Sequence, residues 1–157
     1  MTTLQEAVDD FLAQKRIAVA GVSRQSTEAA NAIYRKLRDA GYEVFAINPR
    51  ATEVEGDPCY ASLWDLPEPV DGIVVATPPQ AAIEVVQDCA KIGVHRVWLH
   101  RSFGEGSASE EAIEYCREHH IQVIPAGCPM MFCEPVDVAH KCIRWFFTAT
   151  KKIPTAV

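Results

Sequence analysis

The sequence has no long hydrophobic run. None of its 157 residues falls in a stretch near the ~18 consecutive apolar residues that a membrane-spanning helix needs. The first residues, MTTLQEAVDDFLAQ, also lack the cationic segment followed by an apolar one that marks a secretory signal peptide. These two absences predict a soluble cytoplasmic protein with no membrane contact.

Basic residues are not in excess either. Lys and Arg number 15 against 21 Asp and Glu, which gives a net charge of −6. A nucleic-acid-binding protein needs a basic stripe that neutralises phosphates, so we expect no nucleic-acid partner. Low-complexity tracts are also missing, and 48% hydrophobic with 23% charged residues is typical of a globular chain. One domain with a sizeable core is expected at this length.

The cysteines do not form a disulfide or metal framework. A reducing compartment keeps scattered cysteines as thiols, and free cysteine is commonly buried. The stretch IPAGCPMMFCEP, residues 124–135, separates Cys128 from Cys133 by four residues, with His140 further on. A zinc site is an alternative there, but a second ligand pair at matching spacing is missing. We therefore expect no metal. The six cysteines are Cys59, Cys89, Cys116, Cys128, Cys133 and Cys142.

Short apolar runs alternate with amphipathic segments along the chain. This alternation predicts an α/β fold, a single Rossmann-like domain with a five-stranded, parallel, doubly wound sheet flanked by helices. The expected strands are residues 16–23, 43–48, 72–77, 94–100 and 121–127. The expected helices are an N-terminal helix within 1–14 and residues 26–41, 80–93, 108–120 and 135–147. Residues 48–69 are interpreted as a loop-rich crossing, and 151–157 as a frayed tail.

Ligands of such sheets bind beyond the carboxyl ends of the strands, near the switch in strand order. All five predicted ends are polar or carry Gly or Pro, and they are residues 21–23, 48–50, 77–79, 100–102 and 127–129. The first end leads through GVSRQSTE into a helix, whose N–H groups and positive dipole end can hold an anion. An ordinary N-capped helix explains the same residues equally well.

The sequence lacks the dinucleotide fingerprint G-x-G-x-x-G, because its positions are taken by Gly21, Ser23 and Ser26. It also lacks the Asp or Glu that holds the ribose of NAD after the second strand, where it reads Asn48-Pro49-Arg50. Arg50 can bind a ribose phosphate through paired hydrogen bonds, which leaves NADP and coenzyme A as ligands. A solvated arginine in a turn is the alternative without a ligand.

Two long motifs combine in this chain: RIAVAGVS followed by a helix, and then EVFAINPRATEVEGDPCYASLWDLPEPVDGIVVATPP. Together they resemble the small stand-alone CoA-binding protein family over roughly residues 15–100. The C-terminal third is similar to the CoA-binding domain of the succinyl-CoA synthetase alpha subunit, in which a P-N-C-P segment meets the cofactor. Here the corresponding residues, 125–129, read PAGCP, so the match is partial.

The resemblance implies a set of residues around coenzyme A or an acyl-CoA. Those expected to hold the pyrophosphate are Gly21, Val22, Ser23 and Arg24, assisted by Ser26. Those expected to flank the adenosine and its 3′-phosphate are Asn48, Pro49 and Arg50, with Ala76, Thr77 and Pro78 on the other side. Those expected to border the pantetheine arm are His100, Arg101, Cys128 and Pro129.

The first hypothesis for function is a small-molecule binding protein, which holds CoA or acyl-CoA as carrier, sensor or regulatory partner without catalysis of its own. The synthetase alpha subunit uses a phosphorylated histidine in a second domain, which we do not expect here. The alternative is an enzyme, an NADP-dependent reductase or an acyl-CoA-processing enzyme using His100 or Cys128. A third hypothesis is an interaction module with a degenerate pocket. A Cys128 that faces the thiol of CoA is expected to form a mixed disulfide with it under oxidation.

Aromatic residues gather near the end of the last predicted helix. The cluster consists of Trp145, Phe146 and Phe147, beside Ile143. In a helix these side chains point in more directions than one apolar face requires. Core packing explains part of the cluster, and an exposed remainder predicts a homodimer contact through this helix.

Overall fold

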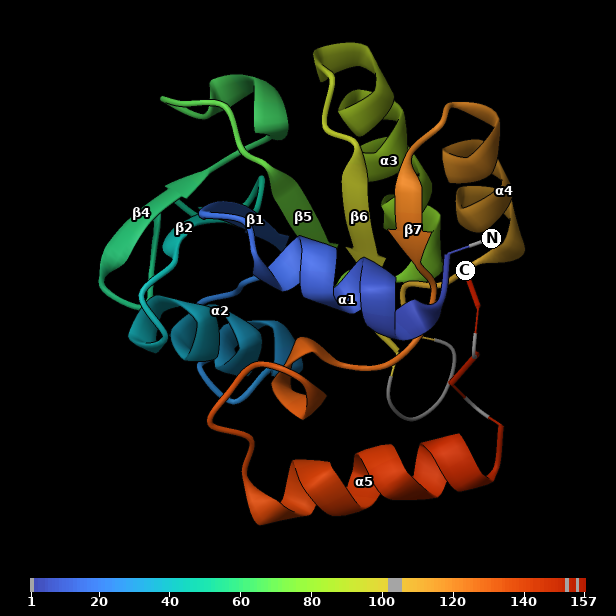
Figure 1. The fold of residues 1–157 in the computed structure, drawn as a ribbon. Helices are drawn as coiled ribbons and strands as arrows, with labels where there is room; N and C mark the ends of the chain where they lie inside the picture. Colours follow the sequence, from blue (N-terminus) through green and yellow to red (C-terminus); the bar gives the residue numbers. More distant parts are fainter. Residues whose placement is uncertain (1, 102–105, 152, 155) are drawn as a thin grey trace.

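Seven strands form one sheet in the computed structural model, which describes residues 2–101, 106–151, 153, 154, 156 and 157 (Figure 1). The strands are β1 (Arg16–Ala20), β2 (Glu43–Ile47), β3 (Glu53–Val54), β4 (Asp57–Tyr60), β5 (Gly72–Val75), β6 (Arg96–Leu99) and β7 (Gln122–Ile124). Their order is β3-β4-β2-β1-β5-β6-β7, and all neighbours are parallel except β3 and β4. The predicted α/β class with a doubly wound sheet is confirmed.

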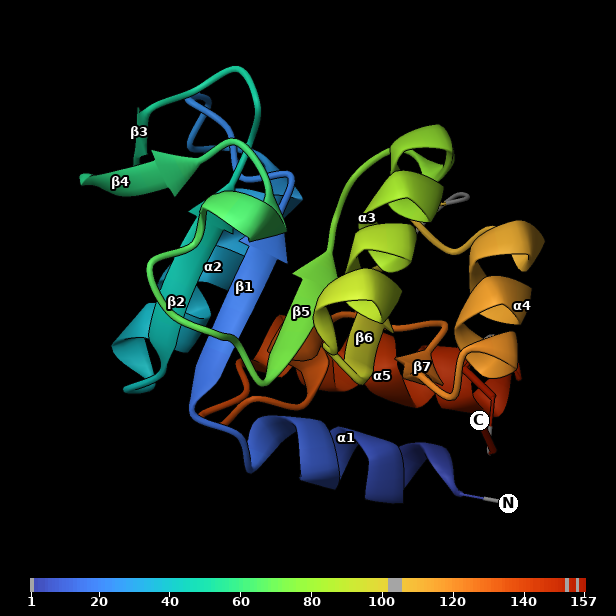
Figure 2. The same ribbon diagram turned by 90° about the horizontal axis from the view of Figure 1, so that it is seen from above.

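Helices cover both faces of this sheet (Figure 2). They are α1 (Leu4–Leu12), α2 (Ala29–Asp39), α3 (Pro79–Ile92), α4 (Glu110–Glu118) and α5 (Val138–Ala149), with short 3-10 turns η1 (Leu63–Asp65) and η2 (Pro129–Met131). One core cluster joins α1, α2, η2 and the buried side of α5, and the other joins α3 and α4. Among the described residues, no helix is both long enough and apolar enough to cross a membrane.

The strand count of five is wrong. All five expected strands are present, but residues 48–69, expected as a loop-rich crossing, also hold β3 and β4. β3 has two residues, and β4 contains Pro58 directly after the Gly56 turn, so Gly and Pro hide the strand pattern. β4 extends the sheet by pairing its last two residues with Ala46 and Ile47 of β2.

The first strand is buried on both sides, which explains its unbroken apolar character. Ile17 and Val19 belong to the cluster with α1 and α2, whereas Ala18 and Ala20 belong to the cluster with α3 and α4. Their exposed fractions do not exceed 2%. A strand with this environment is fixed in register, because a slip by one residue would exchange its two faces.

Two helices begin three residues later than expected. The helix expected from residue 26 begins at Ala29, and the last helix begins at Val138 rather than near Pro135. Asp137 caps this last helix by accepting a hydrogen bond from the His140 amide at 2.9 Å. Hydroxyl and proline residues predict the earlier starts, but three loop residues precede the first helical turn in both cases.

The C-terminal tail lies beside the N-terminus, as both views show (Figures 1 and 2). The Val157 amide donates to the Thr2 carbonyl at 3.0 Å, and Ala156 forms an isolated bridge with Thr3. Ile153 is 6% exposed and belongs to the core cluster of α1 and α2. The described residues of the tail are therefore docked, which corrects the frayed tail expected for 151–157.

Candidate functional site

The order of the strands reverses between β1 and β5, since β1 is followed in space by β2 on one side and by β5 on the other. Two cavities of about 470 and 440 Å³ open at the carboxyl ends of these strands. They form one cleft, because both are lined by the same five residues: Gly21, Asn48, Arg50, Thr77 and Pro78. The cleft occupies the position at which doubly wound sheets bind ligands.

Gly21 directly follows β1, at the floor of the cleft. Its φ is +102°, and a Cβ at this position would lie 2.3 Å from the Ala76 carbonyl oxygen. The same residue donates its amide to the Ile47 carbonyl at 3.1 Å. The chain therefore needs glycine here both for the dihedral angle and for the close approach of the loops that follow β1 and β5.

Asn48 joins the loops after β1 and β2. Its side-chain amide donates to the Val22 carbonyl at 2.9 Å, and its side-chain oxygen accepts from the Arg50 amide at 2.8 Å. Val22 itself is fully buried in the core. The polar atoms of Asn48 thus shape the cleft by holding its two loops, although the residue also lines both cavities.

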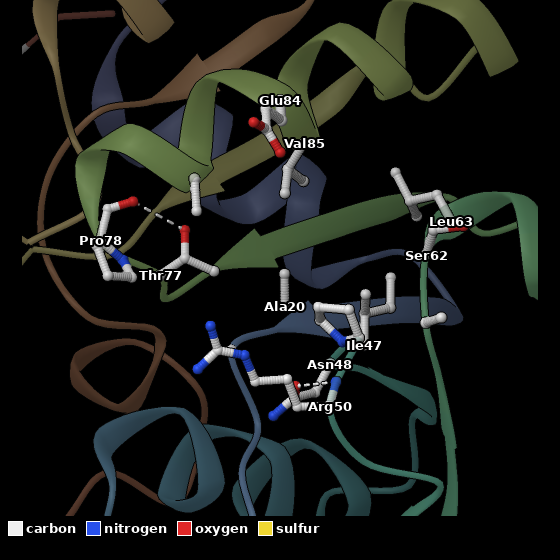
Figure 3. A pocket seen from close by; sticks show the side chains of 14 residues that line it. Ala20, Ile47, Asn48, Arg50, Ser62, Leu63, Thr77, Pro78, Glu84 and Val85 are labelled. Carbon is white, nitrogen blue, oxygen red and sulfur yellow. Dashed lines mark hydrogen bonds between the residues drawn. The ribbon is translucent and has the colours of Figure 1, made fainter.

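Two arginines place positive charges in the cleft. Arg24 lines the second cavity and Arg50 lines both, and within the described part of the chain neither guanidinium has a carboxylate partner. Four of the arginines outside the cleft are paired with carboxylates, namely Arg16, Arg35, Arg38 and Arg96. Figure 3 shows the Arg50 side chain reaching toward Thr77 and Pro78 across the cleft. Two guanidinium groups without a carboxylate partner, on neighbouring loops, can hold an anionic ligand.

The other wall is largely apolar, and the sequence reasoning missed it. Ser62 and Leu63 face Glu84 and Val85 of α3 across the larger cavity (Figure 3). The remaining unpredicted residues of this cavity are Ala20, Ile47, Ala61 and Ala81. Ser62 and Leu63 belong to the Y-x-S-L part of the motif that carried the family resemblance, so that motif was the available signal. Glu84 and Glu28 add two exposed carboxylates to the cleft.

Nine of the predicted residues line the cleft and six do not. Those that line it are Gly21, Ser23, Arg24, Asn48, Pro49, Arg50, Ala76, Thr77 and Pro78. The described residues that line neither cavity are Val22, Ser26, His100, Arg101, Cys128 and Pro129. Ser26 precedes α2 by three residues, so it does not stand at the helix start as expected.

His100 and Arg101 follow β6 behind this cleft. The His100 carbonyl accepts from the Ser107 amide at 2.9 Å, and the buried Ser107 hydroxyl donates to the Thr77 carbonyl. Burial lowers the pKa of the His100 imidazole. The Arg101 amide donates to the Gly127 carbonyl at 3.0 Å. Residues 102–105, which include the last residue of the predicted strand end 100–102, lie outside the described residues.

Cys128 belongs to the core. It is 4% exposed and lies in one cluster with Trp98, Met131 and Cys133. The Trp98 indole N–H donates to the Ala126 carbonyl at 3.2 Å, which fixes the segment before it. The stretch of residues 124–135 is therefore a packing segment, and all six cysteines, each of them described, are thiols. The described residues contain no cluster of three groups able to hold a metal.

The sequence matches the CoA binding domain family over residues 15–134. It is 28% identical over 120 residues to an ADP-forming acetate–CoA ligase of Archaeoglobus fulgidus, covering 73% of this chain and 18% of the ligase. It is 27% identical to the uncharacterized protein YneT of Bacillus subtilis, covering 80% of this chain and 85% of YneT. The solved Thermus thermophilus protein called cell-free ID.343 is 31% identical, with a TM-score of 0.70 over 90% of this chain and 99% of its own.

The relatives differ in size. The chain spans less than a fifth of the length of the acetate–CoA ligase, but most of YneT and nearly all of the Thermus protein. The family match begins before β1 and ends after η2, so it includes every strand and the whole of the cleft described above. The protein belongs to the CoA binding domain family.

Proposed function

We propose that the protein binds coenzyme A or an acyl-CoA in the cleft between β1 and β5, as a carrier, sensor or regulatory protein without catalysis of its own. The observation that carries the proposal is the pair of arginines, Arg24 and Arg50, which lack carboxylate partners among the described residues and lie on two adjacent loops of one cleft. Coenzyme A carries a pyrophosphate and a separate 3′-phosphate. One arginine is available for each of these groups.

The shape and lining of the cleft support a nucleotide. Its cavities of about 470 and 440 Å³ fall within the range of small-molecule sites. Ile47, Leu63 and Val85 offer apolar side chains for a flat base in the larger cavity, whereas Arg24 lines only the second cavity and Arg50 lines both. This division into an apolar part and a cationic part suits adenosine joined to phosphates.

The relatives support the same ligand. The family description names CoA, and the matched ligase is named for CoA. We propose that this chain keeps the nucleotide-holding part of such proteins. Neither His100 nor Cys128, the groups considered for catalysis, lines the cleft, so an NADP-dependent reductase or acyl-CoA-processing enzyme that uses them is the weaker proposal.

Calorimetric titration tests the proposal with three ligands: CoA, dephospho-CoA and NADP. We expect CoA to bind best, and Arg50→Ala to weaken CoA binding by about tenfold to a hundredfold, the range for a charged hydrogen bond. Dephospho-CoA lacks the 3′-phosphate, so Arg50→Ala should cost it little further affinity. Arg117→Ala, on the last turn of α4, is the matched control.

Three results would contradict the proposal. Equal affinity of the wild type for CoA and dephospho-CoA would remove Arg50 as the phosphate contact. A preference for NADP over CoA would overturn the choice of ligand and favour the reductase. Binding of none of the three ligands would leave an interaction module with a degenerate pocket.

A further inference from the structure

The loop after β1, residues 21–28, is held by a buried asparagine of α2. Asn31 is 0% exposed, although its side chain is polar. Its side-chain oxygen accepts from the Ser23 amide at 3.0 Å, and its side-chain nitrogen donates to the Ser23 carbonyl at 2.7 Å. One side chain therefore satisfies both backbone groups of a single loop residue, and this fixes the orientation of that peptide segment.

The same asparagine contacts the turn between β3 and β4. Its nitrogen also donates to the Glu55 carboxylate at 2.7 Å. This carboxylate is 11% exposed and pairs with the Arg35 guanidinium at 2.7 Å. Arg35, one turn beyond Asn31 on α2, donates to the Ser26 carbonyl at 3.0 Å. Glu55 thus links two side chains that hold the loop at Ser23 and at Ser26.

These two attachment points lie on either side of Arg24 and Gln25, which line the cleft. We propose that Asn31, Glu55 and Arg35 are positioning residues, which hold Arg24 toward the ligand and thereby set the affinity of the cleft for phosphates. The inference rests on the proposed function for its ligand, but the effect on the loop is independent of any ligand. Asn31 and Glu55 stay out of the cleft and act through the loop backbone.

The β3-β4 turn takes part in holding the loop after β1. Glu55 has a φ of +51° and precedes Gly56, so the turn projects its carboxylate onto α2. A second set of contacts docks the turn without touching the loop: the Tyr34 hydroxyl donates to Asp57 at 2.8 Å, and Arg38 pairs with Asp57 at 2.7 Å. Tyr34→Phe therefore removes one hydrogen bond between the same helix and the same turn, and it is the matched control.

The test compares Asn31→Ala, Arg35→Met and Tyr34→Phe in two assays. Amide hydrogen exchange without ligand should show faster exchange at Ser23 in Asn31→Ala, because this amide loses its acceptor, and unchanged exchange in Tyr34→Phe. Calorimetry should show CoA binding weakened by about tenfold in Asn31→Ala and in Arg35→Met, as for a lost hydrogen bond, and unchanged in Tyr34→Phe. Arg35 is partly exposed, so Arg35→Met keeps the test decisive if Asn31→Ala does not fold.

The outcomes separate the two proposals. Wild-type protection of the Ser23 amide in Asn31→Ala would overturn the positioning role, whether or not CoA binds. Unchanged CoA affinity in both Asn31→Ala and Arg35→Met, despite a loosened loop, would overturn it as well. A wild type that binds no CoA would refute the proposed function, and the exchange data alone would then decide whether these residues hold the loop.

Discussion

Replacing Gly21 by alanine should destabilise the protein far more than the same replacement at Gly41. Both glycines have positive φ, +102° and +94°, so alanine meets similar backbone strain, about 1–2 kcal/mol, at either position. At Gly41 the new Cβ would have no described atom within 4 Å. At Gly21 it would lie 2.3 Å from the Ala76 oxygen and 2.8 Å from the Ala76 carbonyl carbon.

Backbone atoms cannot rotate away as a side chain can, so the ends of β1 and β5 must separate. Overpacking of this kind costs about 1–3 kcal/mol more, which brings the expected loss for Gly21→Ala to about 2–5 kcal/mol. Urea denaturation of both variants measures the two losses, and the change in the midpoint at constant slope gives each difference in unfolding free energy. Losses that agree within error would refute the close approach at the floor of the cleft. Gly21→Ala should also abolish CoA binding, whereas Gly41→Ala should preserve it.

Three further predictions concern pH, association and oxidation. Burial lowers the pKa of His100 in the folded state, so its contribution to stability is present above about pH 6.5 and is lost as the pH falls below that value. Urea titrations between pH 7.5 and 5.5 should therefore show a smaller loss of unfolding free energy for His100→Gln than for the wild type, and equal losses would contradict the linkage. The Trp145 side chain on α5 is 71% exposed, so the homodimer stays a prediction that light scattering can test. Trp145→Glu should give monomers, whereas Trp64→Glu, at a second exposed tryptophan (58%), should leave the dimer intact. Diamide with CoA should modify the exposed Cys142 before the buried Cys128, and peptide mapping that finds Cys128 modified first would restore the mixed disulfide expected from the sequence.

The alternation of apolar runs and amphipathic segments was sufficient to predict the parallel sheet. Each of the five expected strands is buried on both faces or bounded by clear turn residues, so periodicity identifies them. β3 and β4 were missed for a physical reason. They are short, Gly56 lies in the turn between them and Pro58 lies in β4. Contacts of Glu55 and Asp57 with α2 also stabilise them, and a local sequence pattern cannot show such contacts.

The strand ends in the sequence predict one wall of the cleft but not the other. Gly21, Arg50 and Thr77 lie within three residues after the ends of their strands, so the rule for doubly wound sheets brings them together. Glu84 and Val85 stand in the second turn of α3, and only the packing of that helix brings them to the cleft. Cys128 also follows a strand, but the segment after β7 turns inward and packs beside Trp98.

Both edges of the sheet are unfavourable for the addition of a further strand. One edge strand, β3, is two residues long, and its neighbour β4 contains Pro58, which has no backbone N–H to donate. At the other edge, β7 has three residues and is followed at once by Pro125. Short edge strands beside proline residues disfavour the edge-to-edge pairing through which sheets polymerise. Two copies of this chain are therefore not expected to pair strand to strand, and concentrated samples should stay free of fibrils.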